Sequence, residues 1–454
     1  MKPWAERVAE LTAGLAMTSA LLAPFAFGAS TLGVWVPLSV FWIVLGLLTT
    51  ATRLWFPAAG SQDGFDPAPK LMVALHALFA IQSVALPAAL LRAISPGSFA
   101  AHFLPSGDAF LAPLTASPTG TAQAWLFVGA LHGLAVAIFS APRPVQMRRL
   151  DTLFAGMAGV AGILAIEGLV QAASSNPHRL YGIIEVPGAA DHERGIFGPY
   201  YNRDHYSNLM AMGGAVAAAL IGRAVRAGAF RSVAAFAGSP QFASNLALLG
   251  ALSLIIVASA AAGSRGGLIA LGVGLLAGLG PELLARPKLA LVSLAVALVI
   301  LFGASVPATF LRMADVDFEA SRLMVWRDML RVVSFFPIFG CGLGAFAVAY
   351  WPYQRVVRFE YWPHAHNEYL QWLLETGAVG FVLALFFLRR AWIAAPQLAR
   401  SIETRPALAG LAAMLTHALV DLVLRVPANA AWAALFLTGV TLAATDTRRR
   451  TPQD

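Results

Sequence analysis

The sequence has little charge and almost no cysteine. Asp, Glu, Lys and Arg together make up 12% of its 454 residues, about half of the usual share in a soluble protein. Cys341 is the only cysteine, which excludes an internal disulfide and a cysteine-rich metal site. Hydrophobic residues instead account for 58% of the chain. A protein of this composition has to be solvated by lipid, and we expect no soluble domain of any size.

Apolar runs recur along the whole chain, and each is long enough to cross a hydrocarbon layer of about 30 Å. They predict an all-α integral membrane protein of about twelve transmembrane helices. The expected spans are 8–28, 31–51, 71–94, 123–141, 152–173, 205–222, 244–262, 265–284, 289–309, 367–388, 406–422 and 428–445. We expect N-terminal membrane helices in residues 1–195, a core in 196–446 and a short tail in 447–454.

The net charge of +8 invites a comparison with nucleic-acid-binding proteins, but the positions of the charges favour a membrane topology instead. Most basic residues, including every lysine, fall in alternate loops when the N-terminus is placed in the cytoplasm. The positive-inside rule therefore predicts that both termini are cytoplasmic, and we expect no nucleic-acid partner. The remaining basic residues are arginines on or near the outer side. They must pair with acids, contact lipid headgroups or bind a ligand.

The longest expected outer segment, about residues 310–366, contains a helix of mixed character. Residues 319–336 predict an amphipathic helix that lies on or dips into the membrane interface. Arg322 projects into the apolar face of this helix, so its guanidinium must reach the surface or meet a buried partner. That face comprises Leu323, Trp326, Met329, Leu330, Val333 and Phe336, whereas Arg327, Asp328 and Arg331 project elsewhere.

The residues that follow this helix favour close packing. Pro337 should end it, and Gly340, Gly342 and Gly344 permit a tight backbone more readily than they indicate a nucleotide site. Before the helix, Asp315-Val316-Asp317 resembles an acidic metal-binding pair, but we interpret it as solvated loop acids. We expect no metal and no cofactor.

Polar side chains gather where expected helices begin on the outer side. His366 should stand in the first turn of span 367–388, where the helix dipole favours the neutral imidazole that a general base needs. Taken alone, this histidine is better explained as an interfacial residue that is hydrogen-bonded to a loop. Ser264 should cap the helix that starts at Arg265, which could hold an anion or contact a lipid phosphate. Asn202, Arg203 and His205 open span 205–222.

Five segments carry a family resemblance: FGPYYNRDHYSNLM (197–210), GSRGGLIAL (263–271), SRLMVWRDMLRVVSFFPIFGCGLGAF (321–346), HNEYLQWLLETGAVG (366–380) and HALVDLVLRVPA (417–428). In this order they resemble the O-antigen ligase and polymerase superfamily, which also includes bacterial O-oligosaccharyltransferases. The ligase pattern of a histidine, a leucine four residues on and a glycine seven further is met by His366, Leu370 and Gly377. Arg265 and Arg322 resemble the two essential arginines of the family.

The resemblance implies a metal-independent, inverting glycosyltransferase in the bacterial inner membrane, with its active site facing the periplasm. It would transfer a glycan from undecaprenyl diphosphate to a hydroxyl of lipid A-core or of a growing polysaccharide, in lipopolysaccharide or exopolysaccharide synthesis at the cell envelope. His366 would be the general base, and Arg265 and Arg322 would stabilise the diphosphate. The further substrate-binding residues we predict are Arg203, His205, Asn202, Asn367, Arg327 and Asp421.

Two other functions are considered. A transporter or flippase of lipid-linked or anionic substrates would line its pathway with intramembrane charge. Such charge is scarce in these spans, with Glu167 the clearest case, and this favours an enzyme that works at one surface. A protein O-oligosaccharyltransferase would use the same residues on a different acceptor.

Overall fold

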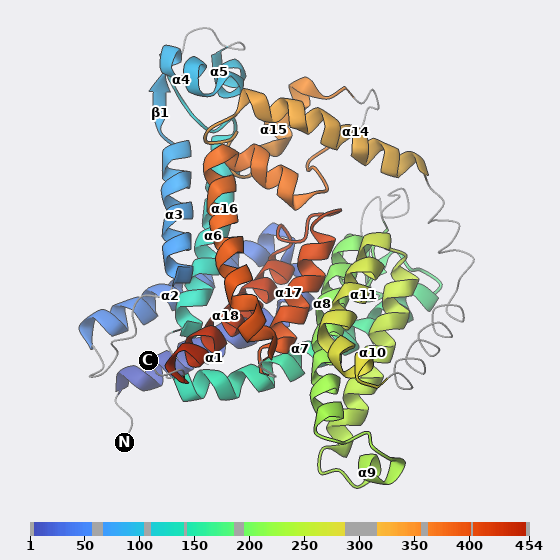
Figure 1. Cartoon of the computed structure of the whole chain (residues 1–454). Coiled ribbons are helices and arrows are strands. Elements are labelled where there is room, and N and C mark those ends of the chain that lie inside the picture. The colour runs from blue at the N-terminus through green and yellow to red at the C-terminus, as the bar shows by residue number, and fades with distance from the viewer. Residues whose placement is uncertain are drawn as a thin grey trace.

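A computed structural model of the chain describes residues 4–56, 67–103, 110–139, 143–185, 195–286, 316–355, 362–400 and 403–450. Within these ranges the protein is a bundle of long helices (Figure 1), with two small two-stranded antiparallel sheets as the only sheets. Eight of the described helices are long and apolar enough to cross a membrane. The expectation of an all-α membrane protein is therefore confirmed, whereas the count of twelve spans is not reproduced in the described part of the chain.

The N-terminal helices form one side of the bundle. They are α1 (Trp4–Leu22), α2 (Leu32–Trp55), α3 (Pro67–Gln82), α6 (Pro118–Phe139) and α7 (Arg143–Ala173), with the one-turn 3-10 helices Ala23–Phe25 and Phe27–Ala29 between α1 and α2. Helices α2 and α6 touch through their backbones, because a methyl group on Gly133 would lie 2.4 Å from the Trp42 carbonyl oxygen. Small residues of this kind let membrane helices approach closely.

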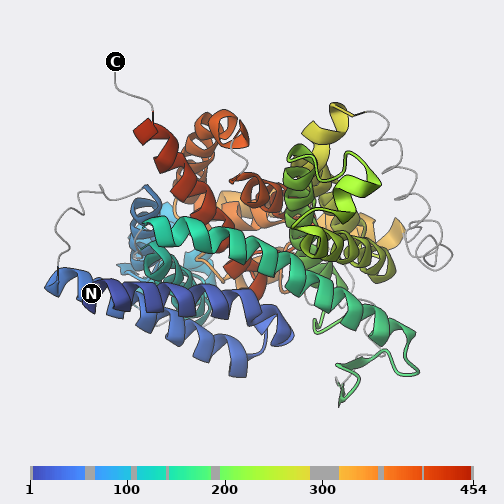
Figure 2. The same ribbon diagram turned by 90° about the horizontal axis from the view of Figure 1, so that it is seen from below.

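The helices that follow in sequence are α8 (Arg203–Arg226), the short α9 (Val233–Ala237), α10 (Phe242–Ala262), α11 (Arg265–Leu284), α16 (Glu368–Arg400), α17 (Arg405–His417) and α18 (Pro427–Arg450). Helices α8, α10, α11 and α17 pack together on the other side of the bundle, whereas α16 and α18 contact the N-terminal helices α1, α3 and α6 (Figure 1). Helix α8 is buried along most of its length between α7, α10, α11 and α17. Figure 2 shows α7 running from the N-terminal helices to α8 and α10, so it joins the two sides.

Short elements cover one end of the bundle, where Figure 1 shows them above the long helices. They are strand β1 (Ala85–Pro87), α4 (Ala88–Ile94), α5 (Pro96–Phe103), β2 (Leu111–Pro113), α14 (Val316–Val332), the 3-10 helix η3 (Val333–Phe335), α15 (Phe346–Tyr350) and the 3-10 helix η4 (Trp351–Tyr353). A further pair, β3 (Arg179–Leu180) and β4 (Ile184–Glu185), lies between α7 and α8. Helices α8, α11, α16 and α18 all begin near this end, so their N-terminal residues can meet there.

Three expected spans differ from the structure or lie outside it. Span 71–94 is wrong as one helix, because α3 ends at Gln82, whose side chain donates to the Phe339 and Glu375 carbonyls, and the chain then forms β1, which pairs with β2. Span 406–422 is shortened to the 13 residues of α17, which is too short to cross a membrane by itself. Span 289–309 lies outside the described residues.

The amphipathic helix of the outer segment is present as α14 followed by η3, and the chain ends it just before Pro337, as expected. Its buried face was only partly predicted. Val325, Met329, Val332 and Phe336 are buried, but Leu323 and Leu330 are 60% and 62% exposed. Asp328, which we expected to project away, is buried and accepts a hydrogen bond from the Arg355 backbone. An interfacial helix can present apolar side chains to both protein and lipid, which a single projection does not separate.

Candidate active site

A buried histidine and a buried aspartate form the centre of the site. The Nδ1 atom of His366 lies 2.8 Å from Oδ1 of Asp421, and each side chain is 2% exposed. His366 lies just before α16 and has a left-handed backbone with φ of 49°, so its expected place in the first helical turn is wrong. Asn367 instead caps the helix, since its side chain accepts the Leu370 N–H at 3.0 Å.

Asp421 belongs to the loop 418–426, which connects α17 to α18. Hydrogen bonds hold this loop near both of its ends. The backbone N–H groups of Val420 and Asp421 donate to the His417 carbonyl at the end of α17, at 3.0 and 3.1 Å. The first residue of α16, Glu368, donates its N–H to the Ala418 carbonyl and accepts the Leu424 N–H through its carboxylate. The position of Asp421 relative to His366 is therefore set by backbone hydrogen bonds.

Arg322 of α14 reaches the same loop. Its Nη1 donates to the Val420 carbonyl at 3.1 Å, and its Nη2 lies 3.7 Å from Oδ2 of Asp204 near the start of α8. The residue is 7% exposed. Of the two possibilities open for this arginine, the structure shows a buried partner. Arg322 thus binds the residue that directly precedes Asp421, the hydrogen-bond partner of His366.

The beginning of α8 contributes three further polar residues. Asn202 caps the helix by accepting the Asp204 N–H at 2.8 Å. Arg203 is the first helical residue and is half-buried. His205 accepts a hydrogen bond from Asn429 through its carbonyl group, and its ring interacts electrostatically with Asp421 and His417. The start of α8 therefore faces the His366 and Asp421 pair.

Arg265 occupies the first position of α11 and is half-buried. The predicted cap is confirmed, because the Ser264 side chain accepts the Gly267 N–H at 3.2 Å. The neighbouring Gly266 packs against the loop and α17: a methyl group there would lie 2.6 Å from a Val420 side-chain carbon and 3.0 Å from a His417 ring carbon. This places the start of α11 against the residues that hold Asp421.

Asp421 remains ionised in this environment. Burial by itself would raise the pKa of its carboxyl group, but the hydrogen bond with His366 and the nearby His205 and His417 hold that pKa well below its usual range. A carboxylate is only an acceptor, so the Nδ1 atom of His366 carries the hydrogen between them. In the neutral ring, the lone pair is then on Nε2.

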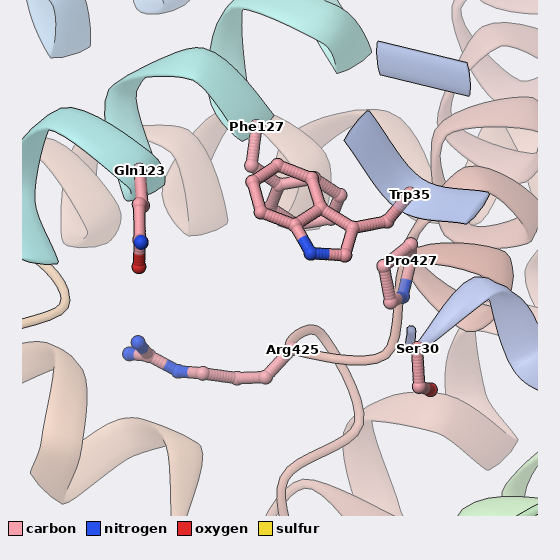
Figure 3. Close-up of a pocket in the computed structure, with 6 residues that line it drawn as sticks. All are labelled: Ser30, Trp35, Gln123, Phe127, Arg425 and Pro427. Atoms are coloured by element: carbon pink, nitrogen blue, oxygen red, sulfur yellow. The ribbon is translucent and has the colours of Figure 1, made fainter. Parts of the chain in front are cut away.

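On the other side of the loop, Arg425 lines a cavity of about 180 Å³ (Figure 3). Its guanidinium Nη2 donates to Oε2 of Glu375 at 2.6 Å, and its Nε lies 3.7 Å from a Glu368 carboxylate oxygen. Burial would lower the pKa of Arg425, but the charges of Glu375 and Glu368 raise it above its usual value. Arg425 therefore lines the cavity as a charged residue that is paired with two acidic side chains.

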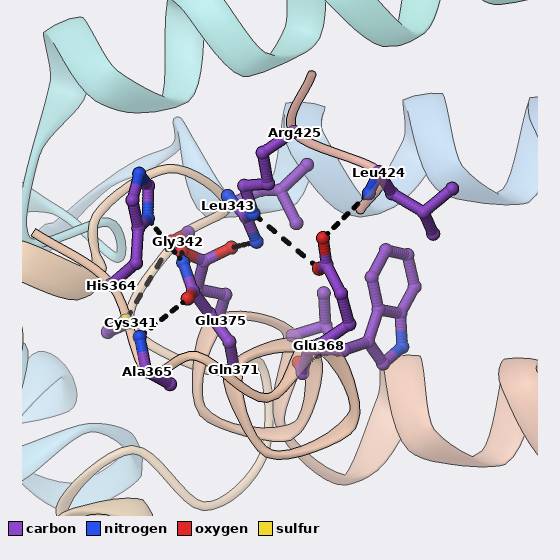
Figure 4. Close-up of polar contacts among 12 residues, drawn as sticks. Cys341, Gly342, Leu343, His364, Ala365, Glu368, Gln371, Glu375, Leu424 and Arg425 are labelled. Atoms are coloured by element: carbon purple, nitrogen blue, oxygen red, sulfur yellow. Dashed lines mark hydrogen bonds and ion pairs between the residues drawn. The ribbon is translucent and has the colours of Figure 1, made fainter. Parts of the chain in front are cut away.

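Figure 4 shows how this arginine continues into a buried polar network. Gln371 donates to Oε1 of Glu375 at 2.9 Å and accepts the Ala365 N–H at 3.0 Å. The Nδ1 atom of His364 lies 3.2 Å from the Gln371 amide nitrogen. Burial, Arg425 and the neighbouring histidines lower the pKa of His364 to about 3. The His364 ring is therefore neutral at physiological pH.

Helix α16 is interrupted beside this network. Gly377 has φ of 61° and ψ of −160°, a conformation restricted to glycine, and a methyl group there would lie 2.4 Å from the Gly340 nitrogen. The segment 337–342 satisfies the backbone groups that the break releases: Cys341 and Gly342 donate to the Leu374 and Glu375 carbonyls, and Ala378 and Val379 donate to the Pro337 and Ile338 carbonyls. The glycine-rich stretch therefore serves packing, as we predicted.

The structure brings together some of the predicted site residues and separates others. His366, Asp421, Arg322 and His205 converge, with Arg265 at the adjoining helix end. Asn202 and Asn367 are helix caps, and Arg327 lies on the exposed side of α14. Sequence reasoning missed several polar residues of the site: Asp204, His364, Glu368, Glu375 and His417. The repeat of histidine in His364-Ala365-His366 was a signal for one of them, whereas Glu375 has no local signature.

A family model matches this part of the chain. No curated protein matches the sequence significantly. The matched family is described as O-antigen ligase and covers residues 250–385, which include Arg265, Arg322 and His366 but not Asp421. This match confirms that the chain resembles the O-antigen ligase and polymerase superfamily of membrane glycosyltransferases.

Proposed function

We propose that the protein transfers a glycan from undecaprenyl diphosphate to an acceptor hydroxyl at the periplasmic face of the bacterial inner membrane. The observation that carries this proposal is the convergence of His366, Asp421 and Arg322 on the loop 418–426 and its surroundings. The hydrogen bond to Asp421 orients one ring nitrogen, and the arginine supplies a positive charge nearby. A general base and a positive charge are two groups that accelerate glycosyl transfer from a diphosphate.

The reaction forms one bond and breaks one. The acceptor oxygen attacks the anomeric carbon of the donor sugar while the bond from that carbon to the diphosphate oxygen breaks. The Nε2 atom of His366 takes the hydroxyl proton, and Asp421 stabilises the imidazolium that results. Attack from the face opposite the leaving group inverts the anomeric centre, in keeping with the inverting mechanism implied by the family resemblance.

Arginines stabilise the leaving group. Negative charge grows on the diphosphate as the glycosidic bond breaks, and a guanidinium can donate two parallel hydrogen bonds to phosphate oxygens. Arg322 and Arg265 are proposed for this role, and Arg203 lies at the neighbouring helix start. Because these arginines come from α14, α11 and α8, they can approach a diphosphate from several directions. The charges come from side chains alone, so this proposal assigns no metal ion to the site.

The acceptor distinguishes three variants of this function. A ligase would use a lipid A-core hydroxyl, a polymerase the end of a growing polysaccharide, and a protein O-oligosaccharyltransferase a serine or threonine side chain. A fourth possibility from another class is a transporter of lipid-linked or anionic substrates. The described ionisable groups of the site cluster at one end of the helices, which supports chemistry at one surface over a pathway through the membrane.

The test is an assay of the purified protein with a lipid-linked donor and each acceptor. The proposal requires transfer by the wild type and none by His366→Ala, with the variant still present in the membrane. Normal transfer by His366→Ala would remove the base assignment. Donor movement across vesicle membranes without any glycan transfer would support the transporter.

A further inference from the structure

The cavity beside Arg425 has a chemistry that the proposed reaction does not use. Its volume is about 180 Å³, smaller than the roughly 300–1,000 Å³ of drug-sized sites, and so suited to one ring-sized group. Figure 3 shows the rings of Trp35 and Phe127 on one side and the guanidinium of Arg425 on the other, with the Gln123 amide pointing toward the space between them. The lining residues are Ser30, Trp35, Gln123, Phe127, Arg425 and Pro427.

These side chains combine flat apolar surfaces with hydrogen-bonding groups. Gln123 and Phe127 are four residues apart on α6 and therefore share one face of that helix. An aromatic ring can pack against the C–H groups on one face of a sugar ring, while an amide and a guanidinium bond to its hydroxyls. A lipid chain offers no hydrogen-bonding group to the Gln123 amide, so it is a poorer fit.

The charge around Arg425 argues against a phosphate in this cavity. Arg425 already forms ion pairs with Glu375 and Glu368, and Glu375 is completely buried. An anion entering the cavity would have to compete with these two carboxyl groups for one guanidinium. On the other face of the loop, the Arg322 guanidinium lies 3.7 Å from a carboxylate oxygen of Asp204. Arg425 is thus suited to a neutral ligand, and the diphosphate of the proposed reaction is assigned to the Arg322 side of the loop 418–426.

The cavity is close to the proposed reaction centre. Asp421 and Arg425 are four residues apart on one loop, so their Cα atoms are at most about 14 Å from each other. The backbone N–H of Leu424, next to Arg425, donates a hydrogen bond to the Glu368 carboxylate. Glu368 is the first residue of α16, and His366 lies just before it. A short oligosaccharide could therefore reach from the cavity to the proposed base, His366.

We propose that the cavity binds one uncharged sugar residue of the glycan substrate, next to the residue that reacts. This inference rests on the proposed function and assigns Trp35, Phe127, Gln123 and Arg425 to sugar recognition. The sugar belongs either to the donor glycan or to the acceptor. In both cases the cavity selects a neutral ring, and the diphosphate is bound on the far side of the loop.

Direct binding tests this assignment without requiring transfer. Glucose, galactose, rhamnose, N-acetylglucosamine and their disaccharides would be added to the full-length His366→Ala protein, with and without Trp35→Ala, and tryptophan fluorescence would be recorded. We expect at least one neutral sugar to change the fluorescence only when Trp35 is present, and inorganic phosphate to leave that response unaltered. Absence of any Trp35-dependent response to these sugars, or its displacement by phosphate, would overturn the inference.

Transfer kinetics assign the sugar to donor or acceptor. Trp35→Ala should raise the KM of one substrate about tenfold or more, equivalent to about 1.4 kcal/mol, with kcat changed much less, and Trp35→Phe should restore most of the loss. Trp55→Ala is the matched control, because Trp55 lies at the opposite end of α2 and is 81% exposed. A raised KM for the donor alone places the sugar in the donor, and a raised KM for the acceptor alone places it in the acceptor. Active enzyme with both KM values unchanged in Trp35→Ala contradicts the inference while leaving the proposed function intact.

Discussion

The Nδ1 atom of His366 and the Oδ1 atom of Asp421 lie 2.8 Å apart, 55 residues from each other in the chain. If this bond holds the base in the reactive tautomer, Asp421→Asn should lower kcat by about 10²–10⁴-fold, the usual contribution of a general base. The kcat of His366→Ala should be lowered to a similar level, and the kcat of the double variant should be no lower, because the two residues act as one unit. Fully additive losses would contradict this coupling.

Arg322 should matter for the leaving group, and its neighbours on α14 should not. Arg322→Ala is expected to lower kcat by about 10²–10³-fold, as for loss of one donor that stabilises transition-state charge. Arg322→Lys should recover only part of the lost kcat, since an ammonium group cannot form two parallel hydrogen bonds to a phosphate. Arg331→Ala on the exposed side of the same helix is the control. Equal losses in the Arg322 and Arg331 variants would indicate a general effect on α14.

Gly377 should be essential for stability. Gly377→Ala forces a side chain into a glycine-only conformation, at a cost of at least about 1–3 kcal/mol, and into contact with the Gly340 nitrogen at 2.4 Å. Thermal unfolding in detergent should therefore begin at a lower temperature. Gly272→Ala on α11 has open space around the new methyl group and should leave stability unchanged or raise it by up to about 1 kcal/mol. The reverse ranking would be inconsistent with the break in α16.

His364 should make the protein sensitive to acid. Its pKa in the folded protein is lowered to about 3, whereas an unfolded histidine titrates near about 6.5. Between these values the unfolded state binds a proton that the folded state does not, so stability falls as pH decreases below about 6.5. Unfolding temperatures measured from pH 7.5 to pH 5 should fall less steeply in His364→Gln than in the wild type. Parallel curves would exclude His364 as the source.

The orientation in the membrane can be tested with two exposed positions. Ile183, between α7 and α8, is 77% exposed, and Val233 on α9 is 85% exposed. In intact cells, a membrane-impermeant maleimide should label Ile183→Cys from the periplasm and should label Val233→Cys only after lysis. Wild-type protein is the control, since Cys341 is fully buried. Labelling of Val233→Cys in intact cells would reverse the predicted topology.

Local sequence features predicted much of the fold and part of the site. Hydropathy identified the membrane helices, because length and apolar composition are sufficient for that. Ser264 was identifiable as a cap from its position before a glycine-rich helix start, and Arg322 as a buried arginine from its place on an apolar face. These properties depend on a few neighbouring residues in the chain.

The remaining features depend on contacts between distant segments. The end of α3 at Gln82 is one example, because the Gln82 side chain donates to the Phe339 and Glu375 carbonyls. No pattern near residue 82 reveals partners more than 250 residues away. The pairing of Arg425 with Glu375 is another. The sequence places Arg425 beside the start of an expected outer helix, but nothing near either residue indicates the other.

The loop 418–426 carries the base partner Asp421, the carbonyl that binds Arg322, the N–H that binds Glu368 and the cavity arginine within six consecutive residues. Surface connections are usually where insertions and deletions accumulate among related proteins. A single inserted residue here would shift half of these groups relative to the other half. Loop length should therefore be invariant among relatives that keep the activity, even where the helices on either side have diverged.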